Sequence, residues 1–208
     1  HGSGFDRKGH AVSLRYALLA LLRVGPLSGY ELAKQFTQSV GHVWHAPDSQ
    51  IYPELRKMEA DGLVEAEEQA RGERGTRRMY HVTDAGDQAF LAWMASPLEY
   101  QRVRDPAHLR AAYLESASPE AAREFFLRHI EQWEGELAQW DDELRKIDHV
   151  DPPNPMLERR LKASPEQEHE RIVAYKHFAY EGLVERAKSE IAWARRGLDL
   201  VDKLDGGS

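Results

Sequence analysis

Apolar residues near the start of the chain recur at helical spacing, and capping or breaking residues mark where each helix stops. A first helix is expected from Ser13 to Val24, because its apolar positions repeat every three or four residues up to Gly25-Pro26. Ser28 then forms a capping box with the glutamate three residues later. This pair predicts a second, short helix that ends near position 41.

A third helix is expected from Asp48 to Ala60. Ile51, Leu55 and Met58 fall on one face at spacings of four and three, so this face should be buried. Asp61-Gly62 ends the helix, since glycine is favoured just beyond helix C-termini. The opposite face is left free to meet another molecule.

Two short strands are expected next, over residues 63–67 and 78–82, because their residues favour extended structure. The glycine-rich residues 70–77 between them predict the tip of a β-hairpin. Thr83 is positioned to cap a fourth helix, which should stop before Ser96-Pro97. Three helices, a hairpin and a closing helix in this order predict a winged helix-turn-helix domain.

The second half of the chain shows only helical patterns. Asp105-Pro106, Ser118-Pro119 and Ser164-Pro165 each place a capping residue before a proline, which is how helices often begin. The last of these helices should extend to about Leu204. Two helices carry apolar seams in steps of four and three, which keep one face toward a partner helix. The seams are Phe126, Ile130, Trp133, Leu137, Trp140, Leu144 and Ile147, and Tyr180, Val184, Ala187, Ile191, Ala194, Leu198 and Val201.

These seams fit two arrangements, because they can close within one chain or pair two chains into a helical dimer. We expect the helical half to mediate dimerisation. The residues expected to carry it are Phe126, Ile130, Trp133, Leu137, Trp140, Val184, Ile191 and Leu198.

The pattern as a whole predicts a mainly α fold in two parts. Residues 10–97 are expected to form the winged helix-turn-helix domain, and residues 98–208 an all-helical dimerisation domain with long antiparallel or coiled-coil-like helices. Residues 1–9 begin His-Gly-Ser-Gly without a methionine, which indicates a tag remnant and an N-terminal arm.

The composition is that of a globular protein. Of the 208 residues 41% are hydrophobic, 30% are charged and none is cysteine, which excludes disulfides, thiol nucleophiles and cysteine-ligated zinc. No apolar run approaches the ~20 residues that a membrane-spanning helix needs. We therefore expect a cytoplasmic protein without a membrane segment.

Positive charge is concentrated in the expected hairpin tip. The net charge is −7, and the helical half carries 17 basic against 23 acidic residues. Between residues 71 and 78, in contrast, four arginines accompany a single glutamate, which is more than a solvated turn needs. Such a cluster favours contact with DNA phosphates.

The exposed face of the third helix supplies the other DNA-binding candidates, because a helix-turn-helix inserts its second helix into the major groove. Gln50 is the best base-reading candidate, since its amide can both donate to and accept from adenine. Tyr52 fits either phosphate contact or packing, and Arg56 and Lys57 either bind phosphates or only solubilise the helix. The full candidate set is Ser49, Gln50, Tyr52, Pro53, Arg56, Lys57, Arg71, Arg74 and Arg77.

Motifs for catalysis are lacking, since the chain has no nucleophile elbow, phosphate-binding glycine loop or dinucleotide fingerprint. His42 and His45 form the tightest histidine pair, but a polar loop explains them better than a metal site. Acidic runs such as Asp141-Asp142-Glu143 are typical of a solvated helix face. No enzymatic activity, cofactor or metal is expected.

Three stretches resemble the PadR family of transcriptional regulators, over roughly residues 12–95. They are Tyr30-Glu31-Leu32, the run from Ser49 to Val64 with its Ile-Tyr-Pro-x-Leu core, and the run from Tyr80 to Gly86 with its Tyr-x-x-Thr-x-x-Gly pattern. The helical half is similar to the C-terminal domain of virulence activators, which belongs to the long form of the family. The resemblance implies a dimeric winged-helix repressor that a small ligand often relieves.

Two departures limit what the resemblance implies. Ser49-Gln50 stands where a small residue and threonine are common in the family. The wing, which is the expected hairpin of residues 63–82, has more arginine than the family requires. The operator sequence therefore does not follow from the family.

Duplicated DNA-binding domains would favour a pseudo-palindromic operator. An apolar or aromatic effector would suit a cavity with aromatic walls, although core packing is the more ordinary role of aromatic residues. The residues that could form such walls are Trp93, Met94, Tyr100, Tyr113, Trp133 and Trp140.

An alternative function is a helical protein-interaction module whose winged domain binds no DNA. A hydrolase is disfavoured by the missing nucleophile motif.

Overall fold

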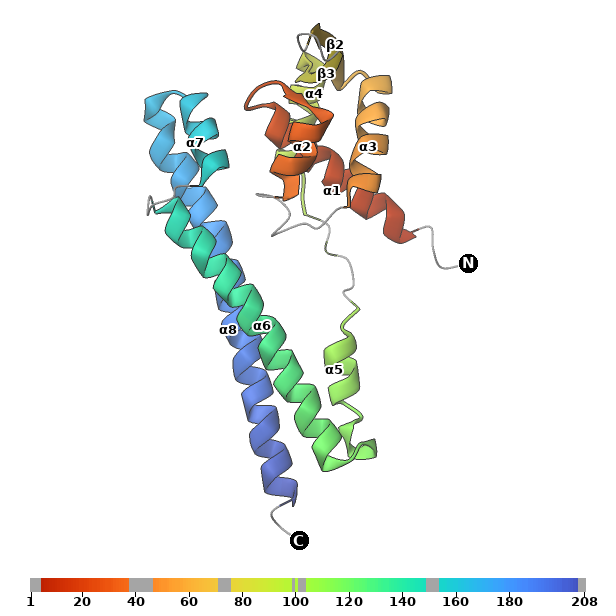
Figure 1. The fold of residues 1–208 in the computed structure, drawn as a ribbon, viewed down its shortest axis with the longest axis vertical. Helices are drawn as coiled ribbons and strands as arrows, with labels where there is room; N and C mark the ends of the chain where they lie inside the picture. The colour runs from red at the N-terminus through yellow and green to blue at the C-terminus, as the bar shows by residue number, and fades with distance from the viewer. Residues whose placement is uncertain are drawn as a thin grey trace. The chain divides into compact units, whose positions relative to one another are not determined.

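The chain divides into two compact units, His1–Glu99 and Tyr100–Ser208. The first contains helices and a small sheet, whereas the described part of the second is entirely helical apart from its connections (Figure 1). This is the mainly α architecture that the sequence predicts. The computed structural model describes residues 5–37, 47–70, 76–98, 100, 104–148 and 154–205.

The N-terminal unit has the element order of a winged helix-turn-helix. Its antiparallel sheet has β3 in the centre, between β1 and β2. Val64 pairs with Val82 and Ala70 with Thr76, so β2 and β3 form the predicted hairpin. The elements are α1 (Phe5–Leu22), β1 (Leu27–Ser28), α2 (Gly29–Gln35), α3 (Asp48–Ala60), β2 (Val64–Ala70), β3 (Thr76–Val82) and α4 (Asp84–Ala95).

The predicted inner face of α3 lies in the core of this unit. Ile51, Leu55 and Met58 are fully buried, as are Leu18 of α1 and Phe36 at the end of α2. Burial of an apolar side chain of this size contributes roughly 1.5–3 kcal/mol relative to exposure. This packing holds α3 in place and leaves its other face in solvent.

The predicted capping residues act as expected. The Ser28 hydroxyl accepts a hydrogen bond from the backbone N–H of Glu31 at 3.3 Å, and the Glu31 carboxylate accepts one from the backbone N–H of Ser28 at 2.9 Å. The Thr83 hydroxyl accepts from the Gly86 backbone at 3.1 Å and fixes the start of α4. Gly62 follows α3 with φ of +71°, a left-handed conformation that favours glycine.

Several boundaries differ from the prediction. Helix α1 begins at Phe5, within the segment that was expected to be an N-terminal arm. The hairpin strands extend further toward the tip, to Ala70 and from Thr76. Strand β1 has only two residues, which is too short to produce an alternating sequence pattern.

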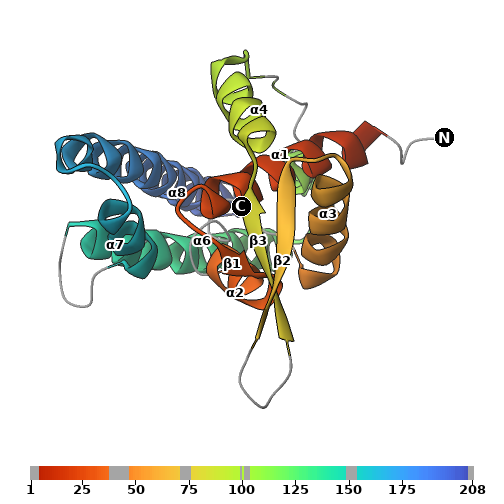
Figure 2. The same ribbon diagram turned by 90° about the horizontal axis from the view of Figure 1, so that it is seen from above.

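The C-terminal unit is built on the long helices α6 and α8, which lie side by side (Figures 1 and 2). Asp105 caps α5 and Ser118 caps α6, as predicted. The last helix begins at His169, after a 3₁₀ turn at Glu166–Glu168, rather than at Ser164-Pro165. The helices are α5 (Pro106–Ala111), α6 (Pro119–Ile147), α7 (Pro155–Lys162) and α8 (His169–Asp205).

The sequence-based prediction misses α7, although Asn154-Pro155 is the same pattern of a capping residue before a proline that marks the other helix starts of this unit. In the structure a tertiary contact orients this cap. Buried Glu143 of α6 accepts a hydrogen bond from Asn154 Nδ2 at 2.8 Å. Asn154 Oδ1 in turn accepts from the backbone N–H of Leu157 at 2.8 Å. Asn154 therefore caps α7 in an orientation that Glu143 fixes.

The apolar seams close between α6 and α8 of the same chain. Phe126, Trp140, Val184 and Ile191 are buried within the chain. The other residues expected to mediate dimerisation pack against the same clusters and are Ile130, Trp133, Leu137 and Leu198. Of the two arrangements that fit the sequence, the structure takes the intramolecular one. Contact of the half-buried members of this set with a second copy stays a prediction.

Close packing between α6 and α8 makes one glycine of α8 sensitive to substitution. A Cβ added at Gly197 would lie 2.3 Å from Cε1 of Phe126. We expect Gly197→Ala to lower the free energy of unfolding by about 1–3 kcal/mol, because the added methyl group overpacks the interface. Urea denaturation followed by circular dichroism measures this change.

Gly182→Ala on the same helix is the matched control. No described atom lies within 4 Å of a Cβ built at Gly182. Alanine should therefore stabilise α8 there by about 0.5–1 kcal/mol, since it is the better helix former. Equal stability of the two variants would contradict the expected clash with Phe126.

Candidate nucleic-acid interface

The outer face of α3 presents most of the residues that the sequence nominates for reading DNA. Ser49, Gln50, Arg56 and Lys57 are exposed. Pro53 is half-buried and lies in the second turn of the helix, just past its first turn. The structure therefore leaves polar and cationic groups exposed on the side of α3 that faces away from the core.

Tyr52 combines the two roles that the sequence left open. A Cβ built at Gly29 would lie 2.8 Å from Cε1 of Tyr52, so the ring packs closely against the first residue of α2. The side chain nevertheless remains 39% exposed. Gly29 thus allows α2 and α3 to approach each other while part of the tyrosine ring stays at the surface.

A buried carboxylate holds α3 against α1. Glu54 Oε1 accepts a hydrogen bond from Arg15 Nε at 2.8 Å, and Arg15 Nη1 lies 2.8 Å from Asp61 Oδ2. Burial alone would lower the pKa of the Arg15 guanidinium, but the interactions with Glu54 and Asp61 outweigh this effect and raise it. The Arg15 side chain therefore stays charged and joins the middle of α3 and the residue after its C-terminal end to α1.

Arg77 of the wing is held by two groups of its own domain. Its Nε and Nη2 donate to Gln69 Oε1 at 3.2 and 3.0 Å, and its Nη1 donates to Glu31 Oε1 at 3.4 Å. Gln69 and Arg77 are opposite each other in the hairpin register, which is where cross-strand pairs interact. The same Glu31 carboxylate also completes the cap of α2, so it connects α2 to the wing.

The remaining arginines of the wing divide into two groups. Arg78 forms an ion pair with Glu59 of α3 and stacks over the Tyr80 ring, with Cζ 5.8 Å from the centroid. Arg71 and Arg74, which are predicted to contact DNA, lie outside the described residues.

The wing and the start of α3 lie on the same side of the unit. In Figure 2 the hairpin projects beside α3, and the N-terminal end of the helix lies toward the side to which the hairpin extends. An exposed helix N-terminus beside a projecting hairpin is the arrangement that a winged helix uses to contact DNA.

Sequence reasoning finds the exposed face but misses the residues that support it. Glu31 is predicted only as a cap, and neither Glu54 nor Gln69 is singled out. The opposite positions of Gln69 and Arg77 are the one available signal, because they follow from the hairpin register.

The described part of the chain contains no group of three or more metal-binding side chains that could hold an ion. His42 and His45 lie outside that part. Among the described helices none is long and apolar enough to span a bilayer.

The aromatic residues considered as effector walls are dispersed. Trp93 stacks on Tyr16 in the winged unit, with ring centroids 4.7 Å apart. Met94 and Tyr113 are exposed. Tyr100, also exposed, begins the second unit. Trp133 and Trp140, in contrast, line the same cavity of the helical unit.

Residues 18–92 match the model of the transcriptional regulator PadR-like family. The negative transcriptional regulator PadR of Bacillus subtilis is 29% identical to the chain over 192 residues, which cover 91% of this chain and 98% of that protein.

Solved structures show the same similarity. The crystal structure of Bacillus subtilis PadR in complex with operator DNA matches with a TM-score of 0.70 at 27% identity, covering 91% of this chain and 99% of that one. The structure of PadR in complex with p-coumaric acid matches with a TM-score of 0.65 at 27% identity, covering 91% and 95%. The fold also resembles that of the Vibrio cholerae virulence activator AphA, with a TM-score of 0.64 at 22% identity and coverage of 92% and 99%.

Proposed function

The chain belongs to the PadR-like family of transcriptional regulators, and we propose that it represses transcription by binding a DNA operator as a homodimer. Its relatives are regulators, not enzymes, and we assign it no catalytic activity. The similar Bacillus subtilis PadR is named as a negative regulator and has been crystallised with operator DNA, which supports the repressor assignment. We further propose that the protein acts in the cytoplasm.

The observation that carries this proposal is the division of α3 into a buried and an exposed face. Ile51 and Leu55 anchor the helix in the core, while Gln50 remains free to reach base edges in the major groove. Arg56 and Lys57 then neutralise phosphates on either side of the groove. The proposed DNA-binding set remains Ser49, Gln50, Tyr52, Pro53, Arg56, Lys57, Arg71, Arg74 and Arg77.

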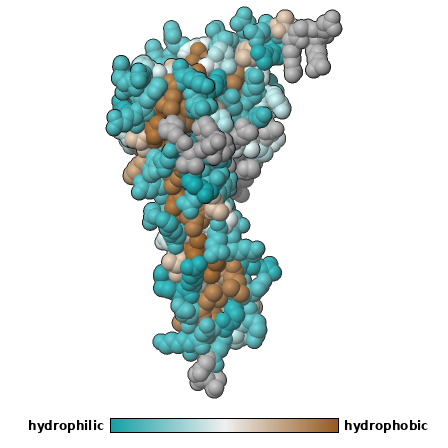
Figure 3. Space-filling model, turned by 60° about the vertical axis from the view of Figure 1, so that its left-hand side comes forward, coloured by the Kyte–Doolittle hydropathy of each residue, from teal (hydrophilic) through white to brown (hydrophobic). Residues whose placement is uncertain are grey.

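Two copies are needed to read an operator with two-fold symmetry. Each copy would present one α3 to a half-site, and the half-sites would lie about one helical turn apart. Apolar side chains remain on the surface of the helical unit, where on the face in Figure 3 they gather in a strip. The exposed apolar residues of this unit that can meet a second copy include Leu109, Tyr113, Leu127, Tyr175, Phe178, Leu200 and Leu204.

A small aromatic molecule is the proposed signal that relieves repression. The similar Bacillus subtilis PadR has been crystallised with p-coumaric acid, an aromatic carboxylic acid. Such a ligand acts by binding the DNA-free form of the repressor more tightly than the DNA-bound form.

Selection of bound sequences from a pool of random duplex DNA tests the proposed function. We expect enrichment of one sequence with two inverted half-sites, which would support both base reading and the dimer. Recovery of sequences without any common motif would overturn the proposal.

Gln50→Ala and Arg56→Ala should separate base reading from phosphate binding. If Gln50 makes a bidentate base contact, its loss should reduce discrimination against one changed base pair by about 1–3 kcal/mol. Arg56→Ala should weaken binding to all sequences by the same factor. Competition binding with single-base variants of the selected operator measures both effects, and identical specificity profiles for the two variants would refute this division.

A further inference from the structure

Two adjacent arginines near the start of β3 each contact a carboxylate of the helix-turn-helix. Arg77 Nη1 lies 3.4 Å from Glu31 Oε1 of α2. Arg78 forms an ion pair with Glu59 of α3. Neighbouring residues of a strand point to opposite faces, so one arginine reaches α2 while the other reaches α3. Positive charges of the wing are therefore paired with negative charges of both helices that are proposed to dock on DNA.

The pair between Arg77 and Glu31 is held in place from both sides. Arg77 Nε and Nη2 donate to Gln69 Oε1 at 3.2 and 3.0 Å, so the cross-strand neighbour orients the guanidinium plane. The other carboxylate oxygen of Glu31 accepts from the backbone N–H and the hydroxyl of Ser28, at 2.9 and 2.7 Å. An exposed ion pair alone stabilises little, but here both partners are already positioned by other hydrogen bonds.

The arginine nevertheless keeps donors for a phosphate. A guanidinium has five N–H groups, and the contacts with Gln69 and Glu31 use three of them. The Arg77 side chain is 40% exposed, so a phosphate can approach the other two. Arg77 therefore presents fixed donors at the surface while its charge is neutralised beside it.

This neutralisation changes how Arg77 acts on DNA. A free arginine is a mobile cation that neutralises a phosphate of any duplex, and such contacts supply nearly all of the sequence-independent affinity. A fixed donor whose charge is already paired binds only a phosphate that lies in the right position. Base contacts by α3 set that position on the operator, whereas no contact sets it elsewhere.

We propose that Glu31 is a specificity-determining residue, which prevents Arg77 from binding the phosphates of DNA without the operator. This assignment rests on the proposed function and assigns a cause to its sequence preference. Glu59 acts on Arg78 in the same way from α3, and Arg78 also lies over the Tyr80 ring. Fewer protomers are then bound to the rest of the genome, and more remain free for the operator.

Fluorescence anisotropy with two duplexes of equal length, with and without the selected operator, tests the role of Glu31. Glu31→Gln removes the charge, while glutamine can still complete the capping box of α2. We expect this variant to bind the duplex without the operator about tenfold more tightly or better. Its salt slope should steepen by about 0.9 for each phosphate that a freed Arg77 neutralises. Operator binding should strengthen less, because base contacts already fix the phosphates around the wing.

Arg77→Gln in two backgrounds shows whether the gain depends on Arg77. Added to Glu31→Gln, it should lower the affinity for the duplex without the operator by about tenfold, because it removes a free cation. In the wild-type chain it should lower this affinity by less than about threefold, since Glu31 already neutralises the charge. Equal losses in the two backgrounds would overturn the proposal.

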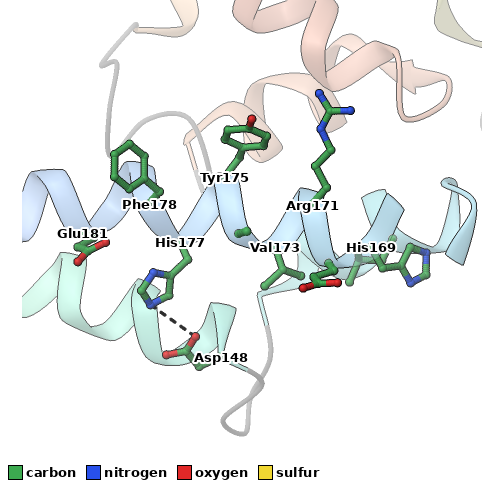
Figure 4. Close-up of a pocket in the computed structure, with 11 residues that line it drawn as sticks. Asp148, His169, Arg171, Val173, Tyr175, His177, Phe178 and Glu181 are labelled. Atoms are coloured by element: carbon green, nitrogen blue, oxygen red, sulfur yellow. Dashed lines mark ion pairs between the residues drawn. The ribbon is translucent and has the colours of Figure 1, made fainter. Parts of the chain in front are cut away.

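Glu181→Gln is the matched control for net charge. Glu181 is exposed on α8, at the edge of the hollow drawn in Figure 4, and within the described ranges it forms no ion pair. The ion pair in that figure joins His177 to Asp148 and leaves Glu181 apart. This substitution changes the net charge as Glu31→Gln does, but it frees no arginine. It should leave both affinities unchanged, and a gain equal to that of Glu31→Gln would refute the release of Arg77.

Glu59→Gln is a second variant that leaves the cap of α2 intact. It should strengthen binding to the duplex without the operator in the same direction, through Arg78. A gain in neither Glu31→Gln nor Glu59→Gln would overturn the proposal, whatever the thermal stability of the first variant.

The same measurements separate this proposal from the proposed function. If the wild-type chain selects an operator and neither variant gains affinity for other DNA, the role of Glu31 is refuted and the repressor stands. If the wild-type chain selects no motif but Glu31→Gln gains an affinity that Arg77→Gln removes, the repressor is refuted. The effect of Glu31 on Arg77 then stands.

Discussion

The affinity for an operator-length duplex is expected to fall by about a thousandfold when the salt concentration rises from roughly 50 to 200 mM. Each proposed protomer brings exposed cations on α3 and arginines of the wing to the phosphates, so a dimer neutralises about six or more phosphates. Every neutralised phosphate releases a condensed counterion, and the logarithm of the binding constant then falls with the logarithm of the salt concentration by about 0.9 per phosphate. Fluorescence anisotropy at several salt concentrations measures the slope.

Two variants calibrate this slope. Lys57→Ala removes an exposed cation from the proposed interface and should make the slope shallower by about one for each phosphate that is no longer neutralised. Lys188→Ala removes an exposed cation from α8, where it pairs with Glu185, and should leave the slope unchanged. A binding constant that does not vary with salt would contradict phosphate binding by the wing and α3.

Leu55→Ala is expected to lower the free energy of unfolding by about 2–5 kcal/mol. Leu55 is fully buried on the inner face of α3, so its truncation removes apolar packing and leaves a cavity that the surrounding helices only partly fill. A reduction of this size is a large fraction of the roughly 5–15 kcal/mol that stabilises a typical domain. Urea denaturation followed by circular dichroism measures it.

The neighbouring residue provides the control for this prediction. Arg56 is exposed on the opposite face of the same helix, and Arg56→Ala should change stability by no more than about 0.5 kcal/mol. The two adjacent substitutions should therefore have opposite profiles, with reduced stability in one and reduced DNA affinity in the other. Comparable destabilisation by both would mean that α3 has no free face.

The parts of the winged unit that depend on local chemistry follow from the sequence. The capping box at Ser28, the cap at Thr83 and the glycine that ends α3 each act within a few residues of their own position. The inner face of α3 follows from periodicity alone, because burial of one helix stripe imposes that spacing.

Features that depend on distant partners do not follow from the sequence. The Asn154-Pro155 pair is a local signal for the start of α7, but no local pattern around Asn154 records that Glu143 holds its side chain. The heptad seams predict a partner helix but not whether it belongs to the same chain, since both arrangements bury the same residues. Likewise, the Glu31 carboxylate that caps α2 with Ser28 also accepts a hydrogen bond from Arg77, and this second contact requires the folded sheet.

The closed seam between α6 and α8 has a consequence for how the proposed assembly is built. A protomer whose longest helices already bury each other can fold before it binds its second copy, unlike obligate dimers, which have no stable folded monomer. Dilution would then separate intact protomers rather than denature them. Cellular abundance would then set promoter occupancy, because the fraction of protomers that are assembled into dimers rises with their concentration.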